Sequence, residues 1–314
     1  MKAFPKLIGL LILLMLFPTM LSAQQIFTAN NYLGNRYMLS PSYGGIDEYT
    51  TVYVGYKREW ANIETGPRTS YANAFFPSSE NVWFGAQVIS DQSDIFRNTQ
   101  IHFSYIQHMQ VGSEGFLDFS IWGTMLQNYI NLAGVDIADV NDPLLMNSTE
   151  FNGTALNAGT SLMYRWREGA IGVNIPFLFQ NKDAYSVGSN KNLFVINRHF
   201  VAYASYNFRV NYDLDFEPML VYRSTTDVVS QIEATALFKY RDNYWAGITY
   251  KDIGKTMISL GAVFAYNFII NYSYEFATGA DISQPAATHE FTVGFIFGKY
   301  TKKSRWRSYY GQAY

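Results

Sequence analysis

A strict alternation of apolar and polar residues is the feature that most constrains the fold of this 314-residue chain. In the stretch 231–240, one face would carry Ile232, Ala234, Ala236, Phe238 and Tyr240, and the other Gln231, Glu233, Thr235 and Lys239. The stretches 51–60, 116–125 and 290–297 alternate in the same way. A period of two is the repeat of a β-strand whose faces meet different surroundings. The pattern therefore predicts an all-β protein.

The same pattern recurs along the chain and indicates about fourteen strands, near the length of tilted membrane strands. Their expected centres are Val54, Ala74, Gly85, Phe103, Phe119, Gly159, Val173, Ala204, Phe216, Ala236, Ile248, Leu260, Tyr272 and Val293. Turn-forming residues separate these stretches. An even number of such strands predicts an antiparallel transmembrane β-barrel of the outer-membrane type, with a soluble secreted β-protein as the alternative.

The composition agrees with a barrel in lipid. Aromatic residues make up 18% of the chain and charged residues only 15%, against about 25% in a typical globular protein. An apolar belt facing lipid and a polar interior would produce this balance. We expect aromatic girdles at the two membrane interfaces, formed by Trp60, Trp83, Trp166, Trp245, Tyr222, Tyr250 and Tyr300.

The first 23 residues are typical of a secretory signal peptide. Lys2 and Lys6 precede an apolar run over 7–17, and a small residue, Ala23, ends the segment. The run is too short for a transmembrane helix, which needs about 20 apolar residues. We therefore expect export from the cytoplasm.

The rest of the chain divides into three parts. Residues 24–49 precede the first strand, and we expect them either to plug the barrel or to contact a periplasmic partner. Residues 50–298 would form the barrel. Residues 299–314 form a basic tail, interpreted as a solvated segment near lipid headgroups, with a docking peptide as the alternative.

Connection lengths predict how the barrel is oriented. Those after odd-numbered strands are mostly long, at 61–68, 90–98, 127–152, 180–198, 223–230 and 277–288. Those after even-numbered strands are short, at 77–81, 110–115, 166–169, 209–211, 241–244 and 266–267. Outer-membrane barrels have short periplasmic turns and longer outward loops. The pattern predicts that both termini are periplasmic.

The sequence offers little for catalysis or cofactor binding. The absence of cysteine excludes disulfides, thiolate metal sites and a cysteine nucleophile. A formal net charge of −2 gives no basic footprint for nucleic acid. His102 and Ser104 share one strand face, as a barrel lipase would need, but polar interior residues explain them more simply. We expect no metal, no cofactor and no enzyme activity.

Three places are candidate contacts for a protein partner. The first is a cationic and aromatic patch at an outward rim, with rim packing as the alternative, and comprises Arg58, Trp60, Pro67 and Arg68. The second is Asp142, Pro143 and Leu144, in the longest loop. The third is Pro41 and Tyr43, in the segment before the first strand.

Several motifs, in order along nearly the whole chain, resemble those of one family. They are Ser40-Pro41-Ser42-Tyr43-Gly44-Gly45; Arg58 and Trp60 with Gly66, Pro67 and Thr69; Asp142-Pro143; His199-Phe200 with Tyr206; Tyr244-Trp245-Ala246-Gly247; and Asn271-Tyr272-Ser273-Tyr274-Glu275. Together they resemble the PorP/SprF family of type IX secretion and gliding-motility membrane proteins. In the first motif Ser40 replaces the family's Asn, and Ser42 and Gly44 replace its two Ala residues.

This resemblance implies a barrel in the outer membrane of a Gram-negative cell, embedded in outer-membrane lipid. The implied role is to dock or anchor specific secreted cargo, including adhesins, often through the cargo's C-terminal domain. Other secretion components, among them periplasmic ring proteins, would be further partners. The alternatives are a porin or transporter for small solutes and, third, a barrel lipase or acyltransferase.

Overall fold

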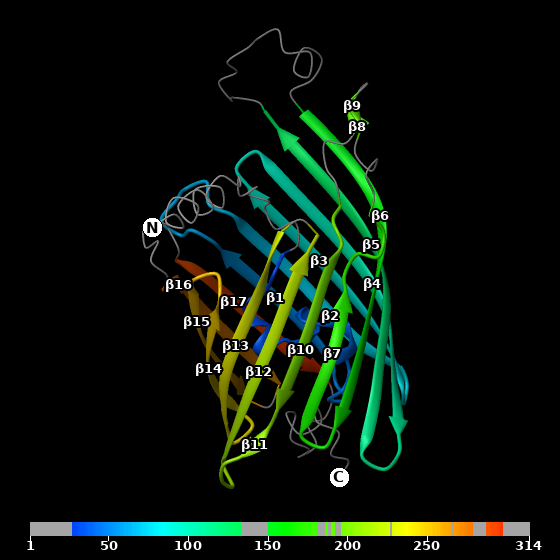
Figure 1. The fold of residues 1–314 in the computed structure, drawn as a ribbon, viewed down its shortest axis with the longest axis vertical. Coiled ribbons are helices and arrows are strands. Elements are labelled where there is room, and N and C mark those ends of the chain that lie inside the picture. The colour runs from blue at the N-terminus through cyan, green and yellow to red at the C-terminus, as the bar shows by residue number, and fades with distance from the viewer. Residues whose placement is uncertain are drawn as a thin grey trace, which may run out of the picture.

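The computed structural model describes residues 27–132, 150–180, 186–187, 190–191, 196–226, 228–265, 267–278 and 287–297. Within these residues the chain forms a closed antiparallel β-barrel (Figure 1). No helix in this part of the chain is long and apolar enough to cross a membrane. The expected signal peptide (1–23) and tail (299–314) lie outside the described residues.

Fourteen strands of the described chain build the barrel wall. They are β1 (Thr50–Arg58), β2 (Arg68–Ser79), β3 (Val82–Ser93), β4 (Phe96–Val111), β5 (Gly115–Asn131), β6 (Glu150–Trp166), β7 (Gly169–Ile175), β10 (His199–Tyr206) with its continuation β11 (Phe208–Arg209), β12 (Leu214–Thr225), β13 (Val228–Tyr240), β14 (Tyr244–Lys251), β15 (Lys255–Phe264), β16 (Phe268–Ala277) and β17 (Thr288–Phe297). Each strand pairs with its neighbours in chain order, and β17 pairs with β1 to close the barrel. Strands β8 (Ser186–Val187) and β9 (Asn190–Lys191) pair only with each other. Every predicted strand centre lies within one of the fourteen, so the predicted fold class is confirmed.

A proline explains why β10 and β11 are separated. Ser205 of β10 is paired with Met219 of β12. The same register resumes in β11, where Phe208 lies opposite Phe216. Pro218 lies between these partners, and its nitrogen has no hydrogen to donate to the ladder. The two pieces are therefore one strand of the wall with a local gap in its hydrogen bonds.

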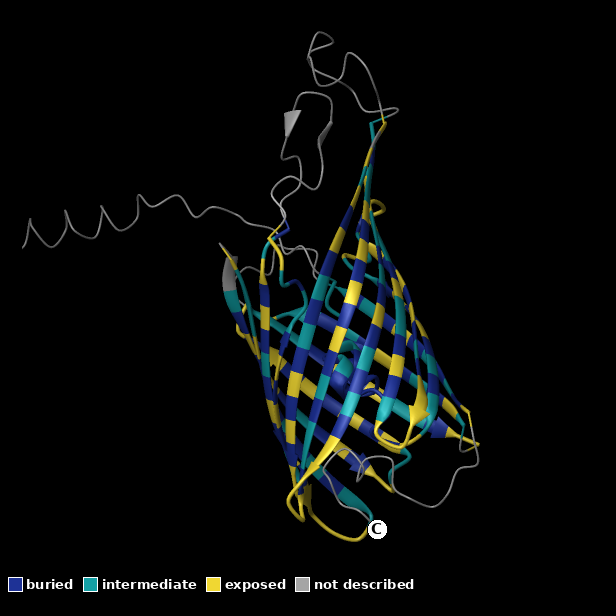
Figure 2. Cartoon of the chain, turned by 90° about the vertical axis from the view of Figure 1, so that its right-hand side faces the viewer, coloured by how far each residue is buried: buried dark blue, intermediate teal, exposed yellow. Residues whose placement is uncertain are grey.

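The two faces of each strand meet different surroundings, as the alternating bands of Figure 2 show. Phe103 of β4 is 68% exposed, whereas its neighbours His102 and Ser104 are buried. Val54 and Leu220 point outward in the same way. The outer face is thus apolar and the inner face largely polar, as an outer-membrane barrel requires. His102 and Ser104 belong to the packed interior.

Two of the expected girdle residues lie on the inner face instead. Trp60, Trp166, Tyr222 and Tyr250 are exposed near strand ends, as predicted for a girdle, and Tyr300 is outside the described residues. Trp83 and Trp245 are buried, so the prediction is wrong for them. Each packs against a glycine, Gly45 and Gly261 respectively, where a Cβ would come within 2.1 Å of the indole. Their bulk fills the interior and does not anchor the barrel in lipid.

The connections between strands lie at the two ends of the barrel, here called the loop rim and the turn rim. The loop rim carries the connections 59–67, 132–149, 176–198 and 278–287, and the turn rim carries 80–81, 112–114, 167–168, 241–243 and 265–267. The prediction of a long connection is wrong at two places on the loop rim, where the turns at 94–95 and 226–227 have two residues each. There the polar residues that suggested loops continue as paired strands.

Residues 27–49, here called the luminal segment, lie inside the barrel, behind β10 and β12 in Figure 1. The segment forms three short 3-10 turns, η1 (Asn31–Leu33), η2 (Arg36–Met38) and η3 (Pro41–Tyr43). Its apolar side chains join those of the inner wall in one core cluster, which includes Leu33, Leu39 and Ile46 with Trp83 and Trp245. The core of this protein is therefore the barrel interior.

The two ends of the described chain lie at opposite rims. The Thr28 carbonyl accepts a hydrogen bond from Lys57, the next-to-last residue of β1, at the loop rim. Phe297 is paired with Thr50 at the turn rim. The luminal segment thus crosses the barrel before β1 begins. The two termini, both expected in the periplasm, lie outside the described residues.

Candidate functional site

The luminal segment is bonded to most of the barrel wall. Its hydrogen-bond partners lie on β1, β2, β4, β5, β6, β7, β12, β13, β14 and β17. These strands surround the segment on all sides. The segment is therefore held as an integral part of the interior.

An ion-pair cluster fixes the middle of the segment. The Arg36 guanidinium donates to both carboxylate oxygens of Glu217 on β12, at 2.8 and 2.9 Å. Lys239 on β13 reaches the same carboxylate at 3.2 Å, and all three side chains are buried. Buried charges are tolerated only with close partners, because their desolvation is costly. The cluster therefore ties η2 firmly to the wall.

A second anchor lies toward the loop rim. The Glu290 carboxylate accepts the backbone N–H groups of Asn30 and Asn31, at 2.6 and 3.3 Å. The Tyr71 hydroxyl donates to the same carboxylate at 2.6 Å. Asn31 also donates through its side chain to Thr292, at 2.8 Å. The inward-facing Glu290 carboxylate thus fixes the position of the first residues of the luminal segment.

A third anchor lies toward the turn rim, on His108 of β4. Its Nδ1 is 2.7 Å from the Asp118 carboxylate, and its Nε2 is 3.0 Å from the Gly44 carbonyl. The two ring nitrogens therefore face oxygen atoms, one on the barrel wall and one on the luminal segment. Arg165 also pairs with Asp118. His108 and Arg165 therefore share this carboxylate, and the contact of His108 with Gly44 holds the end of η3 in place.

The tyrosines of the luminal segment are buried neutral groups. Burial raises the pKa of Tyr37 and of Tyr43 to about 12 each. Burial, and then the charge of Glu233, raises the pKa of Tyr32 further above its ordinary range. The Tyr32 hydroxyl donates to Glu233 on β13 at 3.0 Å, and the Tyr37 hydroxyl lies 2.7 Å from that of Ser104 on β4. They remain protonated hydrogen-bonding groups at physiological pH.

These contacts close the described part of the lumen. An aqueous channel would leave its lining in contact with water, as in the wide porins. Here Asn73, Ser104 and Thr235 face inward and are buried. While the luminal segment is in place, no polypeptide can pass through this interior. A macromolecular partner therefore has no access to the described interior.

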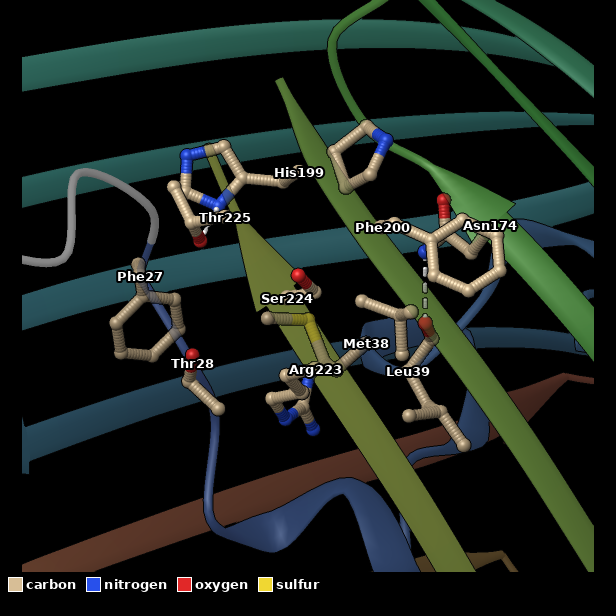
Figure 3. A pocket seen from close by; sticks show the side chains of 12 residues that line it. Phe27, Thr28, Met38, Leu39, Asn174, His199, Phe200, Arg223, Ser224 and Thr225 are labelled. Carbon is tan, nitrogen blue, oxygen red and sulfur yellow. Dashed lines mark hydrogen bonds between the residues drawn. The ribbon is translucent and has the colours of Figure 1, made fainter. Parts of the chain in front are cut away.

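A small pocket opens at the loop rim, with a volume of about 70 Å³ (Figure 3). Its lining residues are Phe27, Thr28, Met38 and Leu39 of the luminal segment, with Asn174, Pro176, His199, Phe200, Val201, Arg223, Ser224 and Thr225 from the wall. Figure 3 shows the hydrogen bond from the Asn174 amide to the Leu39 carbonyl, 2.9 Å long. We call this site the rim pocket.

Two polar atoms of the rim pocket have no partner within the described chain. They are Nε2 of His199 and Oδ1 of Asn174, both on buried side chains. The other ring nitrogen of His199 is 2.8 Å from the Thr225 hydroxyl. Buried polar groups usually find a partner. A space of this size holds a few water molecules or one side chain, either of which can satisfy them.

The predicted contacts in the β1–β2 connection come together on the loop rim. Arg58 donates to the Ile63 carbonyl at 3.2 Å, and Arg68 to the Glu64 carbonyl at 2.7 Å. Arg58 and Arg68 also lie opposite each other in the β1–β2 ladder. Trp60 is 42% exposed. These residues are thus gathered on the loop rim, where Arg58 and Arg68 brace the loop.

The backbone of this loop is also fixed. The Glu59 N–H donates to the Pro67 carbonyl, and the Ala61 N–H to that of Ala287, both at 2.9 Å. The loop thereby contacts the β16–β17 connection. Arg58, Trp60, Pro67 and Arg68 are presented on an ordered scaffold.

The other predicted contacts are placed differently. Pro41 and Tyr43 belong to η3 inside the barrel, where the Tyr43 ring lies 5.5 Å from that of Tyr203. A partner outside the barrel cannot reach Tyr43 in this arrangement. Asp142, Pro143 and Leu144 lie outside the described residues. In the described residues, the loop-rim patch is therefore the predicted candidate open to a partner.

Sequence reasoning missed the interior anchors. Glu217, Glu290 and Asp118 are inward carboxylates within strands, and each is bonded to the luminal segment directly or through one residue. A carboxylate inside a barrel with few charges is itself a signal, because it must have a buried partner. No group of residues able to hold a metal ion occurs in the described chain.

Comparison with known structures supports the fold. The chain resembles the CymD monoaromatic hydrocarbon channel with a TM-score of 0.53 at 11% identity, covering 86% of this chain and 94% of that one. A Pseudomonas aeruginosa FadL homologue gives 0.47 at 9% identity, covering 79% and 90%. The Ralstonia pickettii toluene transporter TbuX gives 0.43 at 10% identity, covering 80% and 88%. At 11% identity the likeness to CymD shows the barrel fold alone.

The sequence itself gives the family. No curated protein matches the chain. Residues 21–295 match the family described as type IX secretion system membrane protein PorP/SprF. That description names a membrane protein of a secretion system, and the family is one of non-enzymatic outer-membrane barrels. The chain belongs to the PorP/SprF family of type IX secretion system membrane proteins, as its motifs predicted.

Proposed function

We propose that this barrel docks or anchors a specific secreted protein at the cell surface, as an outer-membrane component of the type IX secretion and gliding machinery. The observation that carries the proposal is the filled lumen. Arg36, Glu290 and His108 hold the luminal segment across the interior, so the barrel is suited to a scaffold and not to a conduit. A barrel that acts as a scaffold would bind its partners at its two rims.

The loop rim is the end that fits a secreted partner. Long connections gather there, and in outer-membrane barrels these face outward. The patch formed by Arg58, Trp60, Pro67 and Arg68 offers an exposed indole and cations on a braced loop. Such residues are enriched where proteins bind each other, and a rigid loop loses little entropy on binding. Asp142, Pro143 and Leu144 remain predicted contacts of the same rim.

The turn rim is the end that fits the secretion machinery. Short turns face the periplasm in this class of barrel. Exposed ion pairs occur there, between Arg167 and Glu114 at 2.7 Å and between Arg241 and Asp213 at 3.2 Å. We propose that periplasmic ring proteins contact this side of the barrel and also bind the basic tail of residues 299–314.

A complementation experiment tests the docking role. Deletion of the gene should remove particular proteins from the cell surface, as measured by mass spectrometry of surface-labelled cells. The wild-type gene should restore them, whereas the triple variant Arg58→Ala, Trp60→Ala, Arg68→Ala should restore them poorly. The matched control is the conservative variant Arg58→Lys, Trp60→Phe, Arg68→Lys, which keeps the charges and the aromatic ring at the same positions and should restore surface display. Unchanged surface proteins in the deletion strain would refute the proposal.

A further inference from the structure

The floor of the rim pocket is a patch of the inner wall that spans three neighbouring strands. Val201 of β10 lies opposite Asn174 of β7 and opposite Arg223 of β12. Two residues earlier in β10, His199 lies opposite Thr225 of β12. Side chains two residues apart in a strand share a face, and Val201, His199 and Asn174 are all buried. Asn174 and His199 are therefore close neighbours on two adjoining strands.

The luminal segment supplies the facing side of the pocket, through Phe27, Thr28, Met38 and Leu39. Figure 3 shows Phe27 on one side of the space and Asn174 on the other. Apolar side chains make up much of the lining, and the polar groups are few. Ligand pockets are commonly built in this way, with apolar walls and a small number of placed polar atoms. Water alone is held less well in such a space, because it needs several polar partners.

Two polar atoms of the floor are left without a hydrogen bond within the described chain. They are Asn174 Oδ1 and His199 Nε2, and each of these residues is only 7% exposed. The other polar atom of each side chain is already used. The Asn174 amide donates to the Leu39 carbonyl, and His199 Nδ1 lies 2.8 Å from the Thr225 hydroxyl. An unpaired buried polar group is costly, so a ligand that supplies both missing hydrogen bonds is favoured.

The groups around the pocket restrict the charge of such a ligand. The Asn174 amide oxygen only accepts hydrogen bonds, so a carboxylate would leave it unpaired. Arg223 lines the pocket and pairs with Glu233 at 2.6 Å, and its positive charge disfavours an ammonium or guanidinium group. An uncharged group that both donates and accepts is compatible with both sides. A carboxamide is such a group, because its NH2 donates and its carbonyl oxygen accepts.

The size of the pocket narrows the choice further. Its volume of about 70 Å³ is well below the roughly 300–1,000 Å³ of sites that enclose a whole small molecule. One water-sized atom takes about 10–15 Å³ in this measure, so the space holds about five such atoms. That is the size of a carboxamide with one or two methylene groups, and it is more than a lone hydroxyl fills.

We propose that the rim pocket is a recognition pocket for one asparagine or glutamine side chain of the secreted partner. The source of the side chain rests on the proposed function, since it requires a protein that docks at the loop rim. Thr28, Arg223 and Thr225 are partly exposed, so the pocket can be reached from that rim. The NH2 group of the bound side chain donates to Asn174 Oδ1, and its carbonyl oxygen accepts from His199 Nε2.

Titration of the purified wild-type barrel with three small probes tests this chemistry without a partner protein. Propionamide carries the carboxamide, butanone has a methyl group in place of the NH2 group, and propionate is charged. The readout is the NMR signal of the His199 imidazole in barrel that carries isotope-labelled histidine. This signal is assigned by its loss in His199→Phe, or by replacing the other histidines in turn if that variant does not fold.

We expect propionamide to shift the His199 signal in a saturable manner. Butanone and propionate should bind at least about tenfold more weakly, because each leaves a buried polar atom unpaired. The absence of a saturable shift with propionamide would mean that the pocket holds water only, and it would overturn the proposal. An equal response to butanone would overturn it as well.

Surface display in cells tests the source of the side chain. At equal amounts of folded barrel in the outer membrane, His199→Phe should restore the surface proteins of the deletion strain poorly, whereas the control His289→Phe should restore them. The control is matched, because His289 also contacts a hydroxyl, that of Tyr272 at 2.8 Å, but does not line the pocket.

Full restoration of display by His199→Phe would overturn the assignment of the pocket to the secreted partner. The two proposals fail separately. If deletion of the gene leaves the surface proteins unchanged while propionamide still binds at His199, the proposed function fails and the carboxamide chemistry of the pocket is upheld.

Discussion

Arg36 in the luminal segment and Glu217 in β12 form a buried ion pair, although 181 residues separate them. One guanidinium nitrogen lies 2.8 and 2.9 Å from the two carboxylate oxygens. This contact joins the luminal segment to the barrel wall. It indicates that the segment is part of the native interior, since a buried carboxylate left without its partner is costly.

Replacing Arg36 should therefore destabilise the whole barrel. Arg36→Met removes the guanidinium that pairs with the buried Glu217 carboxylate, and we expect a loss of about 3 kcal/mol in the free energy of unfolding. Urea unfolding of the barrel refolded in lipid vesicles measures the change. The control, Arg68→Met on the exposed rim, should change it by less than about 0.5 kcal/mol. Equal effects of the two substitutions would contradict an integral role for the segment.

Substitutions at two glycines with left-handed backbones should distinguish the cost of backbone strain from the cost of a steric clash. Gly45 has φ +81° and lies against Trp83, whereas Gly112 has φ +72° and open space around it. Gly112→Ala should cost about 1–2 kcal/mol from the backbone alone. Gly45→Ala should cost more, because its Cβ would also meet the indole. The same unfolding experiment compares them, and a smaller cost at Gly45 would show that Trp83 is not packed on the segment.

Alkaline pH should loosen the interior. The pKa of Tyr37 and of Tyr43 is about 12 in the fold against an ordinary value of 10, so the folded state holds these protons more tightly. Their stabilisation is complete below pH 10 and is lost as the pH rises towards 12, by about 2–3 kcal/mol for each tyrosine. The double variant Tyr37→Phe, Tyr43→Phe should lose less free energy of unfolding between pH 9 and pH 12 than the wild type. An identical pH dependence would mean that these tyrosines are open to water.

Electrical recordings distinguish the scaffold from the rival small-solute porin. The wild-type barrel in a planar bilayer should show no steady conductance, because the luminal segment fills the described interior. A variant lacking residues 27–46 should conduct, since a barrel of about fourteen strands has room for solutes once emptied. Steady current through the wild type, equal to that of the variant, would favour the porin.

The strands could be predicted because lipid outside and polar contacts inside impose a period of two on every strand. That alternation says which residues share a face, but not which aromatic residues face inward. Trp83 and Trp245 were therefore assigned to the wrong side. The path of the luminal segment could not be predicted, because its short 3-10 turns have no long periodicity. Its position depends on partners distant in sequence, such as Glu217 and Glu290.

The candidate site was predictable only in part. The Arg58–Arg68 loop was identified from its density of cationic and aromatic residues, which local sequence displays directly. The rim pocket was not, because it combines Phe27 and Leu39 with His199 and Thr225 across the barrel mouth. Such a site exists only once the segment is seated.

Site-specific crosslinking can show whether a secreted protein docks at the loop rim. Glu64→Cys and Ser113→Cys, both exposed and at opposite rims, are coupled to a short thiol-linked photocrosslinker in cells with an active type IX system. We predict that Glu64→Cys captures a secreted protein, identified by mass spectrometry, and that Ser113→Cys does not. Capture of no secreted protein at Glu64, or the same capture at both rims, would contradict the account.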